Sequence, residues 1–226
     1  MFKSEEDRVH GNDLEKSAPT SNIVLNGKTL KQVEKFKYLI TTLITTDARR
    51  TSEISCRISQ AKAAFQTIGN ILASRKISMN VRKRVLNTYV YPILMYSSEI
   101  WNINKHQKRL EATEMWFLRW MLRISYKDHV KNEDVLKRAE TSSSQLNHIR
   151  IRQATFFGRI MRQLGMEHTV TTGKICGKRD RGRQREKMLD GLTAWLQTSD
   201  PSSTIASVWN GEEWRTMIAE AAKHGT

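Results

Sequence analysis

Apolar residues recur at steps of three and four over a long stretch in the first half of the 226-residue chain. Steps of this size place side chains on one face of an α-helix. The pattern predicts an amphipathic helix from about residue 52 to 73. Its apolar stripe consists of Ile54, Ile58, Ala61, Phe65, Ile68 and Leu72.

The next helix is expected to begin after Ser78, because serine is a residue type that caps helix N-termini. Pro92 lacks a backbone donor, so the helix should bend or stop there. Its apolar side would carry Val81, Val85 and Tyr89.

Helical spacing continues through the second half of the chain. Asn132 is expected to cap a short helix, and two final helices are expected over 187–196 and 212–222. The apolar positions of one further helix are Leu110, Phe117, Met121 and Ile124, flanked by Trp116 and Trp120. Those of another are Leu146, Ile149, Phe156, Ile160 and Leu164.

The segment before residue 46 favours extended structure instead. In IVLNGKTL, the pair Asn26-Gly27 lies between short β-prone runs, and Asn-Gly accepts the positive φ angles of a type I′ hairpin turn. VEKFKYLITTLIT, rich in Phe, Tyr, Ile and Thr, predicts a third extended piece. The expected fold class is mainly α, with a helical bundle, a small N-terminal β-hairpin, a basic Gly-rich loop and C-terminal helices.

Five segments follow from these patterns. Residues 1–21 are polar and of mixed charge, which is typical of a disordered lead. After them we expect a β-hairpin region over 22–50, a helical domain over 51–126, a helical extension over 127–170, and the basic loop with the C-terminal helices over 171–226.

Charge suggests a polyanionic partner. The chain has 38 Lys and Arg against 23 Asp and Glu, a net charge of +15. Nucleic acid is favoured over a membrane, because apolar runs such as 89–96 are too short to span a bilayer.

The N-terminus has no signal-peptide core, and two cysteines cannot form a disulfide framework. We therefore expect an intracellular protein of the nucleus or cytoplasm.

The charge is concentrated in GKICGKRDRGRQREKML, Gly173 to Leu189, which has seven basic and two acidic residues. Glycines let this backbone follow a phosphate ladder, and arginine can bind phosphate bidentately. The alternative is a solvated loop that only keeps the protein soluble. The candidate phosphate-binding residues are Lys174, Lys178, Arg179, Arg181, Arg183, Arg185 and Lys187.

A second candidate patch is formed by Arg152, Arg159 and Arg162, which share one arc of a helix. It would either extend the basic track or be a solvated helix face. Trp116 and Trp120 could stack on bases, although aromatic residues at helical spacing more often belong to a core.

Catalytic and metal-binding templates do not fit the residues present. The six histidines are scattered, and Cys56 and Cys176 lie far apart without a second cysteine near either. There is no phosphate loop, no nucleophile elbow and no adjacent pair of aspartates that would hold two metal ions. We expect no cofactor in this chain.

Several motifs occur in a recognisable order. VEKFKYLITTL is followed by EISCRISQAKAAF, SRKISMNVRKRVLNTYVYPILMYSSEIW and RLEATEMWFLRWMLRIS, and later by VKNEDVLKR, RQATFFGRIMR, GKICGKRDRGRQREKMLDGLTAW and EEWRTMIAEAA. Together they resemble the primer grip, helical thumb and tail of the reverse transcriptases of non-LTR (LINE-type) retrotransposons. The resemblance covers nearly the whole chain.

The resemblance implies a thumb-like domain over 51–126 and a primer-grip-like hairpin with Phe36, Tyr38 and Leu39. The implied partners are RNA, DNA or an RNA–DNA duplex. The family's Tyr-x-Asp-Asp motif is absent from these residues and would lie upstream, in a palm that would also hold Mg²⁺. We therefore expect a fragment of an RNA-directed DNA polymerase that holds the primer–template duplex and is inactive alone.

An alternative remains from a different functional class. The chain could be a non-catalytic helical interaction domain derived from a degenerate transposon. Its Trp and Met surfaces, which would once have packed on the missing palm, would now meet a protein partner or self-associate.

Overall fold

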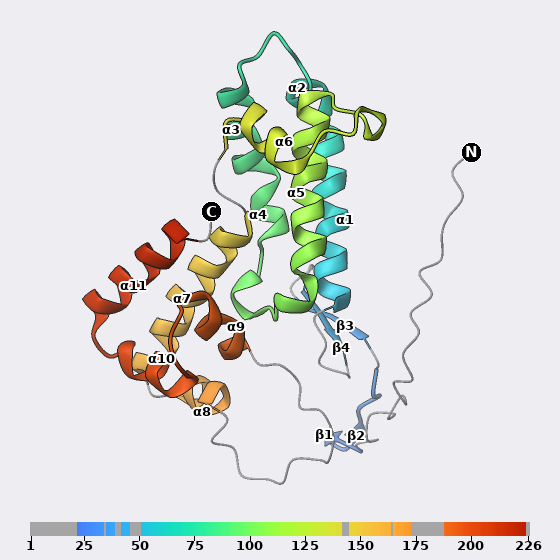
Figure 1. Ribbon diagram of the computed structural model, residues 1–226. Helices are drawn as coiled ribbons and strands as arrows, with labels where there is room; N and C mark the ends of the chain where they lie inside the picture. Colours follow the sequence, from blue (N-terminus) through green and yellow to red (C-terminus); the bar gives the residue numbers. More distant parts are fainter. Residues whose placement is uncertain are drawn as a thin grey trace. The chain divides into compact units, whose positions relative to one another are not determined.

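The computed structural model describes residues 22–33, 35–38, 42–45, 51–141, 145–163, 165–172 and 188–224, most of which are helical (Figure 1). Backbone contacts divide the chain into two units, residues 1–49 and 50–226. The expected fold class, mainly α with a small N-terminal hairpin, is confirmed. The finer segment boundaries at 126 and 170 stay predictions.

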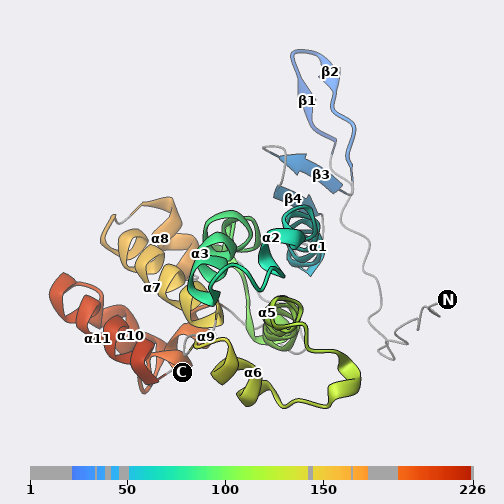
Figure 2. The ribbon, with the colours of Figure 1, turned by 90° about the horizontal axis from the view of Figure 1, so that it is seen from above.

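The first unit contains two short antiparallel strand pairs (Figure 2). β1 (Val24–Leu25) pairs with β2 (Lys28–Thr29). Asn26 has φ of 50° and Gly27 has φ of 76°, both positive as a type I′ turn requires, so the predicted hairpin is confirmed. β3 (Lys35–Tyr38) pairs with β4 (Thr42–Thr45). The single extended piece predicted over 33–45 is therefore two paired strands.

The second unit is helical. Its α-helices are α1 (Thr51–Thr67), α2 (Gly69–Leu72), α3 (Met79–Tyr89), α4 (Tyr91–Leu94), α5 (Gln107–Leu122), α6 (Asn132–Arg138), α7 (Gln145–Gln163), α8 (Met166–Thr172), α9 (Met188–Trp195), α10 (Pro201–Ser207) and α11 (Gly211–His224). Short 3₁₀ turns are η1 (Ser98–Ile100), η2 (Asn104–His106) and η3 (Tyr126–Asp128).

Two of these helices, α8 and α10, were not predicted. For α10 the sequence carried a signal, because Asp200 precedes a proline at the first helical turn. The Asp200 carboxylate accepts a hydrogen bond from the Ser203 backbone at 2.7 Å, which satisfies an otherwise unpaired helical N–H.

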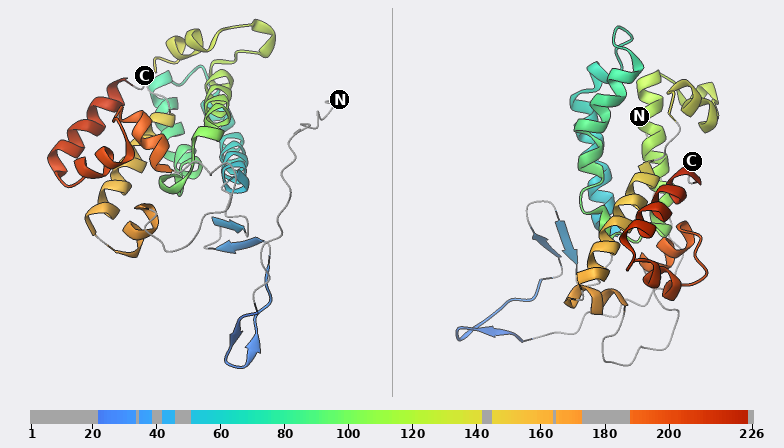
Figure 3. Two further views of the ribbon diagram at one scale, coloured as in Figure 1. Left: turned by 60° about the horizontal axis from the view of Figure 1, so that its bottom comes forward. Right: turned by 90° about the vertical axis from the view of Figure 1, so that its left-hand side faces the viewer.

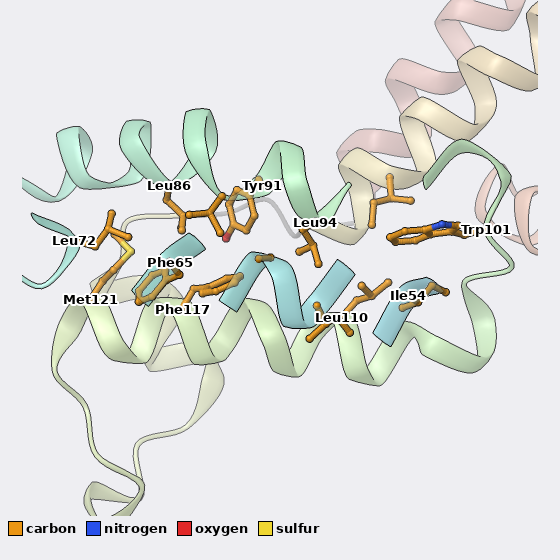
Figure 4. Packing of buried hydrophobic residues seen from close by; sticks show 14 of the residues in the cluster. Ile54, Phe65, Leu72, Leu86, Tyr91, Leu94, Trp101, Leu110, Phe117 and Met121 are labelled. Carbon is orange, nitrogen blue, oxygen red and sulfur yellow. The ribbon is translucent and has the colours of Figure 1, made fainter. Parts of the chain in front are cut away.

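The first hydrophobic cluster lies among α1, α3, α4 and α5 (Figure 4). The predicted apolar stripe of the first helix is confirmed, since Ile54, Ala61 and Phe65 are fully buried. The helix itself is interrupted at Ile68, which separates α1 from α2. At the centre, the rings of Phe65 and Phe117 stack with their centroids 4.9 Å apart.

The predicted apolar face of α3 is only partly correct, since of its three residues Val85 alone packs against the first cluster, partly buried. Val81 and Tyr89 are exposed, whereas Leu86 and Val90 are buried. The true stripe also advances in steps of four, but it begins with Arg82. A charged residue in a core-facing position concealed this stripe from the hydrophobic pattern.

Arg82 is buried because it bonds the ends of two other helices. Its side chain is 9% exposed, and Nη1 donates to the carbonyl of Leu72, at the end of α2, and to that of Met121, in the last turn of α5, at 3.2 and 2.7 Å. The last carbonyls of a helix have no intrahelical partner and carry partial negative charge. One guanidinium thus ties α2, α3 and α5 together.

The helix at 132 also begins differently from the prediction. Its N-cap position is Lys131, and Asn132 is already helical. The Asn132 side chain instead accepts a hydrogen bond from Arg119 Nη2 at 2.9 Å. This bond links the start of α6 to α5.

The second hydrophobic cluster packs α7 against α9 and α11, with α10 beside α9 (Figure 3). Trp214 of α11 is buried, and its indole Nε1 donates to the Ala154 carbonyl at 3.1 Å. A Cβ atom at position 158 would lie 2.5 Å from the same nitrogen, so Gly158 is the residue that lets the indole approach α7. The two predicted C-terminal helices, α9 and α11, are confirmed.

α7 connects the two clusters. Ile149 near its start belongs to the first, and Phe157 further along belongs to the second. Between them, Gln153 is fully buried and donates to the carbonyls of Ser98 and Trp101 at 3.0 and 2.8 Å. Both clusters therefore depend on the placement of one helix.

The role of Arg82 leads to a stability prediction. Replacing it by Met keeps most of the apolar stem but leaves two buried carbonyls without a donor. We expect Arg82→Met to lower the free energy of unfolding by about 2–4 kcal/mol. Urea denaturation followed by circular dichroism measures this. Arg84→Met is the matched control, because Arg84 lies in the same helix but is exposed. Equal losses in the two variants would contradict the account.

Candidate nucleic-acid interface

The seven candidate phosphate-binding residues of the basic loop lie outside the described residues. This applies to Lys174, Lys178, Arg179, Arg181, Arg183, Arg185 and Lys187. Their assignment stays a prediction from charge and composition.

The second predicted patch, the arginine arc of α7, has its members in different surroundings. Arg152 forms a salt bridge with Glu99, donating from both Nε and Nη2 to one carboxylate oxygen. Arg162 Nη1 donates to the carbonyl of Val208 at 3.0 Å. Arg159 is exposed, and within the described ranges no hydrogen bond or salt bridge engages it. Two of the three arginines therefore hold neighbouring segments, and Arg159 has the most accessible charge.

The primer-grip-like residues are only partly described. Phe36 lies in β3 with an exposed side chain, opposite Ile44 of β4. Tyr38 ends β3, and Leu39 lies outside the described residues. Their predicted function remains a prediction.

A more complete basic and aromatic surface lies on the outer side of α1 and α5, which run side by side in the second unit (Figures 1 and 2). We call it the Trp120 face. Its members are Lys62 of α1, Arg109, Trp116 and Trp120 of α5, and Arg123, which follows α5.

Helix geometry explains why these side chains gather. Arg109, Trp116 and Arg123 are seven residues apart, a spacing that returns to nearly the same side of a helix. The outer arc of α5 (109, 112, 116, 119, 120, 123) has no acidic residue, and the adjoining arc of α1 (55, 59, 62, 66) has Ser, Ser, Lys and Gln. The face is therefore positive, and neither arc carries a competing carboxylate.

The aromatic rings of the face rest on the first hydrophobic cluster. Phe65 lies below both indoles, with centroid distances of 5.3 Å to Trp116 and 5.9 Å to Trp120. The two indoles are 5.2 Å apart and tilted by 53°. Lys62 Nζ lies 5.3 Å from the centre of the Trp116 ring, within the range of a cation–π interaction. Trp120 is 44% exposed.

Arg123 closes α5 in the left-handed conformation, with φ of 56°. Its Nε donates to the carbonyl of Ala73 at 3.2 Å. That bond directs the guanidinium across the end of α2, and Nη1 and Nη2 have no partner among the described residues. Arginine has five N–H donors, so Arg123 can bond Ala73 and a further acceptor at once.

His106, just before α5, adds no charge to this surface near neutral pH. Burial lowers the pKa of its imidazole, and the neighbouring positive charges of Arg109 and Lys105 lower the pKa further. Its Nε2 lies 3.3 Å from the Thr51 hydroxyl, which places the ring between η2 and α1.

The sequence suggested only part of this face. The sequence raises base stacking for Trp116 and Trp120 but favours a core position for both, and it does not single out Lys62, Arg109 or Arg123. The available signal was the heptad step that joins arginine and tryptophan along α5. What the sequence could not show is that Phe65 of α1 packs against both indoles of α5, with Trp120 left at the edge of the cluster.

The part of the chain that the structure describes contains no cluster of three or more His, Cys, Asp or Glu side chains that could hold a metal ion. None of its helices is long and apolar enough to span a membrane.

Comparisons with known proteins add nothing further to this geometry. No protein-family model, curated protein or solved structure matches the chain.

Proposed function

We propose that this chain binds nucleic acid, as the thumb and tail region of a LINE-type reverse transcriptase that lacks its catalytic palm. The observation that carries the proposal is the Trp120 face. It brings three cations and two tryptophans onto one surface whose helical arcs contain no carboxylate. Phosphates and bases are the ligand groups that these two side-chain types bind together.

The dimensions of the face suit a nucleic-acid backbone. Arg109 and Arg123 are fourteen positions apart, which corresponds to about 21 Å along α5 at the helical rise. That length accommodates several successive phosphates. The basic loop and Arg159 would add contacts of the same sequence-independent kind, so binding is expected to depend on charge more than on base sequence.

The chain's charge and its lack of an aspartate pair support a binding role without polymerase chemistry of its own. RNA, DNA and RNA–DNA duplexes all present the phosphates that the basic residues would contact. A separate polymerase palm is a further partner consistent with the motif order.

The basic loop generates one prediction. On B-DNA, log K falls with log salt by about 0.9 for each phosphate contact. Replacing Arg179, Arg181, Arg183 and Arg185 by Ala should therefore reduce the slope by up to about 3.6 if all four touch phosphate. Fluorescence anisotropy with two unrelated duplexes across a salt series measures the slope, with circular dichroism of the variant alongside. An unchanged slope with intact helicity would assign the loop to solubility alone.

The Trp120 face generates a second prediction, on described residues. Arg109→Gln together with Arg123→Gln should reduce the salt slope by up to about 1.8. The matched control is Arg84→Gln with Arg215→Gln, which removes two exposed arginines of α3 and α11 and the same net charge. If the control pair lowers the slope as much as the test pair, binding follows net charge rather than this face.

One observation supports the alternative of a protein-interaction or self-associating domain. The hairpin region of the first unit exposes an unusual number of aliphatic side chains. These are Ile23, Val24, Leu25, Leu30 and Val33. Exposed apolar patches of this kind commonly mark protein contacts.

The alternative predicts self-association through the hairpin. Sedimentation velocity over a concentration series should then show a dimer that Leu25→Lys with Leu30→Lys abolishes. Thr29→Lys adds charge to the same hairpin without removing an apolar group, so it should leave the dimer intact. A wild-type protein that is monomeric at every concentration would contradict self-association.

A further inference from the structure

We infer that Trp120 stacks on an unpaired nucleobase, so that the Trp120 face binds single-stranded RNA or DNA more tightly than duplex. This inference rests on the proposed nucleic-acid binding and specifies its ligand.

Trp120 is held in place but not covered. Phe65 meets the indole edge-on, at an interplanar angle of 81°, and Trp116 packs beside it. A Cβ atom at position 69 would lie 4.0 Å from Trp120 Nε1, so the backbone of α2 approaches the indole at Gly69, a residue with no side chain of its own. The indole is therefore packed against two other rings, while the Trp120 residue as a whole stays 44% exposed.

Trp116 is not equivalent. It is less exposed, and the Lys62 ammonium group lies near its ring. Of the two indoles on the face, Trp120 is the more exposed, while Lys62 beside Trp116 supplies positive charge close by.

A stacked nucleotide would also find a cation for its phosphate. Arg123 follows Trp120 by three positions, at the C-cap of α5. Trp120 Nε1 lies near Gly69 of α2, and Arg123 Nε bonds the carbonyl of Ala73, directly after α2, so both side chains lie against the same short segment. The bond from Arg123 Nε to the Ala73 carbonyl leaves the terminal guanidinium nitrogens for phosphate. Base and phosphate of one nucleotide can thus be bound by Trp120 in the last turn of α5 and by Arg123 at its C-cap.

The preference for unpaired bases follows from how accessible the base faces are in a duplex and in a single strand. Interior bases of a duplex are already stacked on both faces, so an indole on a helix surface can meet only their phosphates. An unstacked base in a single strand presents its whole face. Such stacking strengthens binding by about 5- to 150-fold for each base.

The experiment compares three fluorescein-labelled ligands by anisotropy. They are a single strand of about 20 nucleotides, longer than typical single-strand sites, a strand of the same length in which every base is replaced by an abasic residue, and the duplex of the intact strand with its complement. The abasic strand keeps the phosphates and removes the stacking partner, so wild-type protein alone already tests the inference. We expect about 5- to 150-fold tighter binding of the intact strand than of the abasic one.

Variants then locate the effect. Trp120→Ala should remove the difference between intact and abasic strands while affinity for the duplex changes by less than about twofold, whereas Trp120→Phe should keep most of it. Trp209→Ala is the control, because Trp209 is 51% exposed but is followed by Glu212 and Glu213 at the start of α11. It should leave all three affinities unchanged. Circular dichroism and urea unfolding confirm that each variant is folded.

The outcomes separate the two proposals. If wild-type protein binds none of the ligands at low salt, the proposed function fails. If it binds all three with equal affinity, nucleic-acid binding stands and the stacking inference is wrong. Equal weakening of all three ligands by Trp120→Ala, or loss of the difference in Trp209→Ala, would also overturn the assignment to Trp120.

Discussion

The packing of Phe65 against α5 is the contact on which the arrangement of the first helical cluster depends. Its side chain is fully buried and meets three aromatic rings of one helix, Trp116, Phe117 and Trp120. Truncating a buried phenylalanine typically costs about 3–5 kcal/mol. The same contact sets the position of the two indoles, so the core and the proposed binding face share one determinant.

Buried polar groups then specify how the other helices meet this pair. The Arg82 guanidinium joins the C-terminal carbonyls of α2 and α5. The Glu114 carboxylate of α5 accepts from the backbone N–H of Gln145, where negative charge complements the start of α7. Gln153 next ties α7 to the turn at η1. Each group forms hydrogen bonds with backbone atoms at the end of a helix or at a turn. Apolar packing is not directional, so at these places the hydrogen bonds set how the helices are oriented.

Apolar packing within local patterns could be predicted from the sequence, whereas buried polar groups that join distant helices could not. The stripe of α1, the hairpin turn at Asn26-Gly27 and the helices α9 and α11 follow from local periodicity and turn chemistry. The buried face of α3 could not be predicted, because Arg82 occupies a core position. It is buried there because it donates hydrogen bonds to the carbonyls of Leu72 and Met121, which belong to other helices.

The candidate site shows the same limit. Positive charge in the sequence indicates the basic loop and the arginine arc of α7 as candidate sites. The loop lies outside the described residues, and in the arc Arg152 and Arg162 bond neighbouring segments. Whether a tryptophan at helical spacing lies in the core or at its edge depends on which side chain of a neighbouring helix fills the core position next to it. Here that partner is Phe65 of α1, and its contact with α5 is tertiary.

The central claim is that nucleic acid binds at the outer face of α1 and α5. The most direct test is to follow the tryptophan indole N–H signals of ¹⁵N-labelled protein by NMR during titration with a single-stranded oligonucleotide, the six signals being assigned by single Trp→Phe variants. Trp120 and Trp116 should shift or broaden, while the buried Trp101 and Trp214 and the exposed Trp209 stay in place. Perturbation confined to Trp209 or Trp195, with Trp120 unmoved at saturation, would contradict the account.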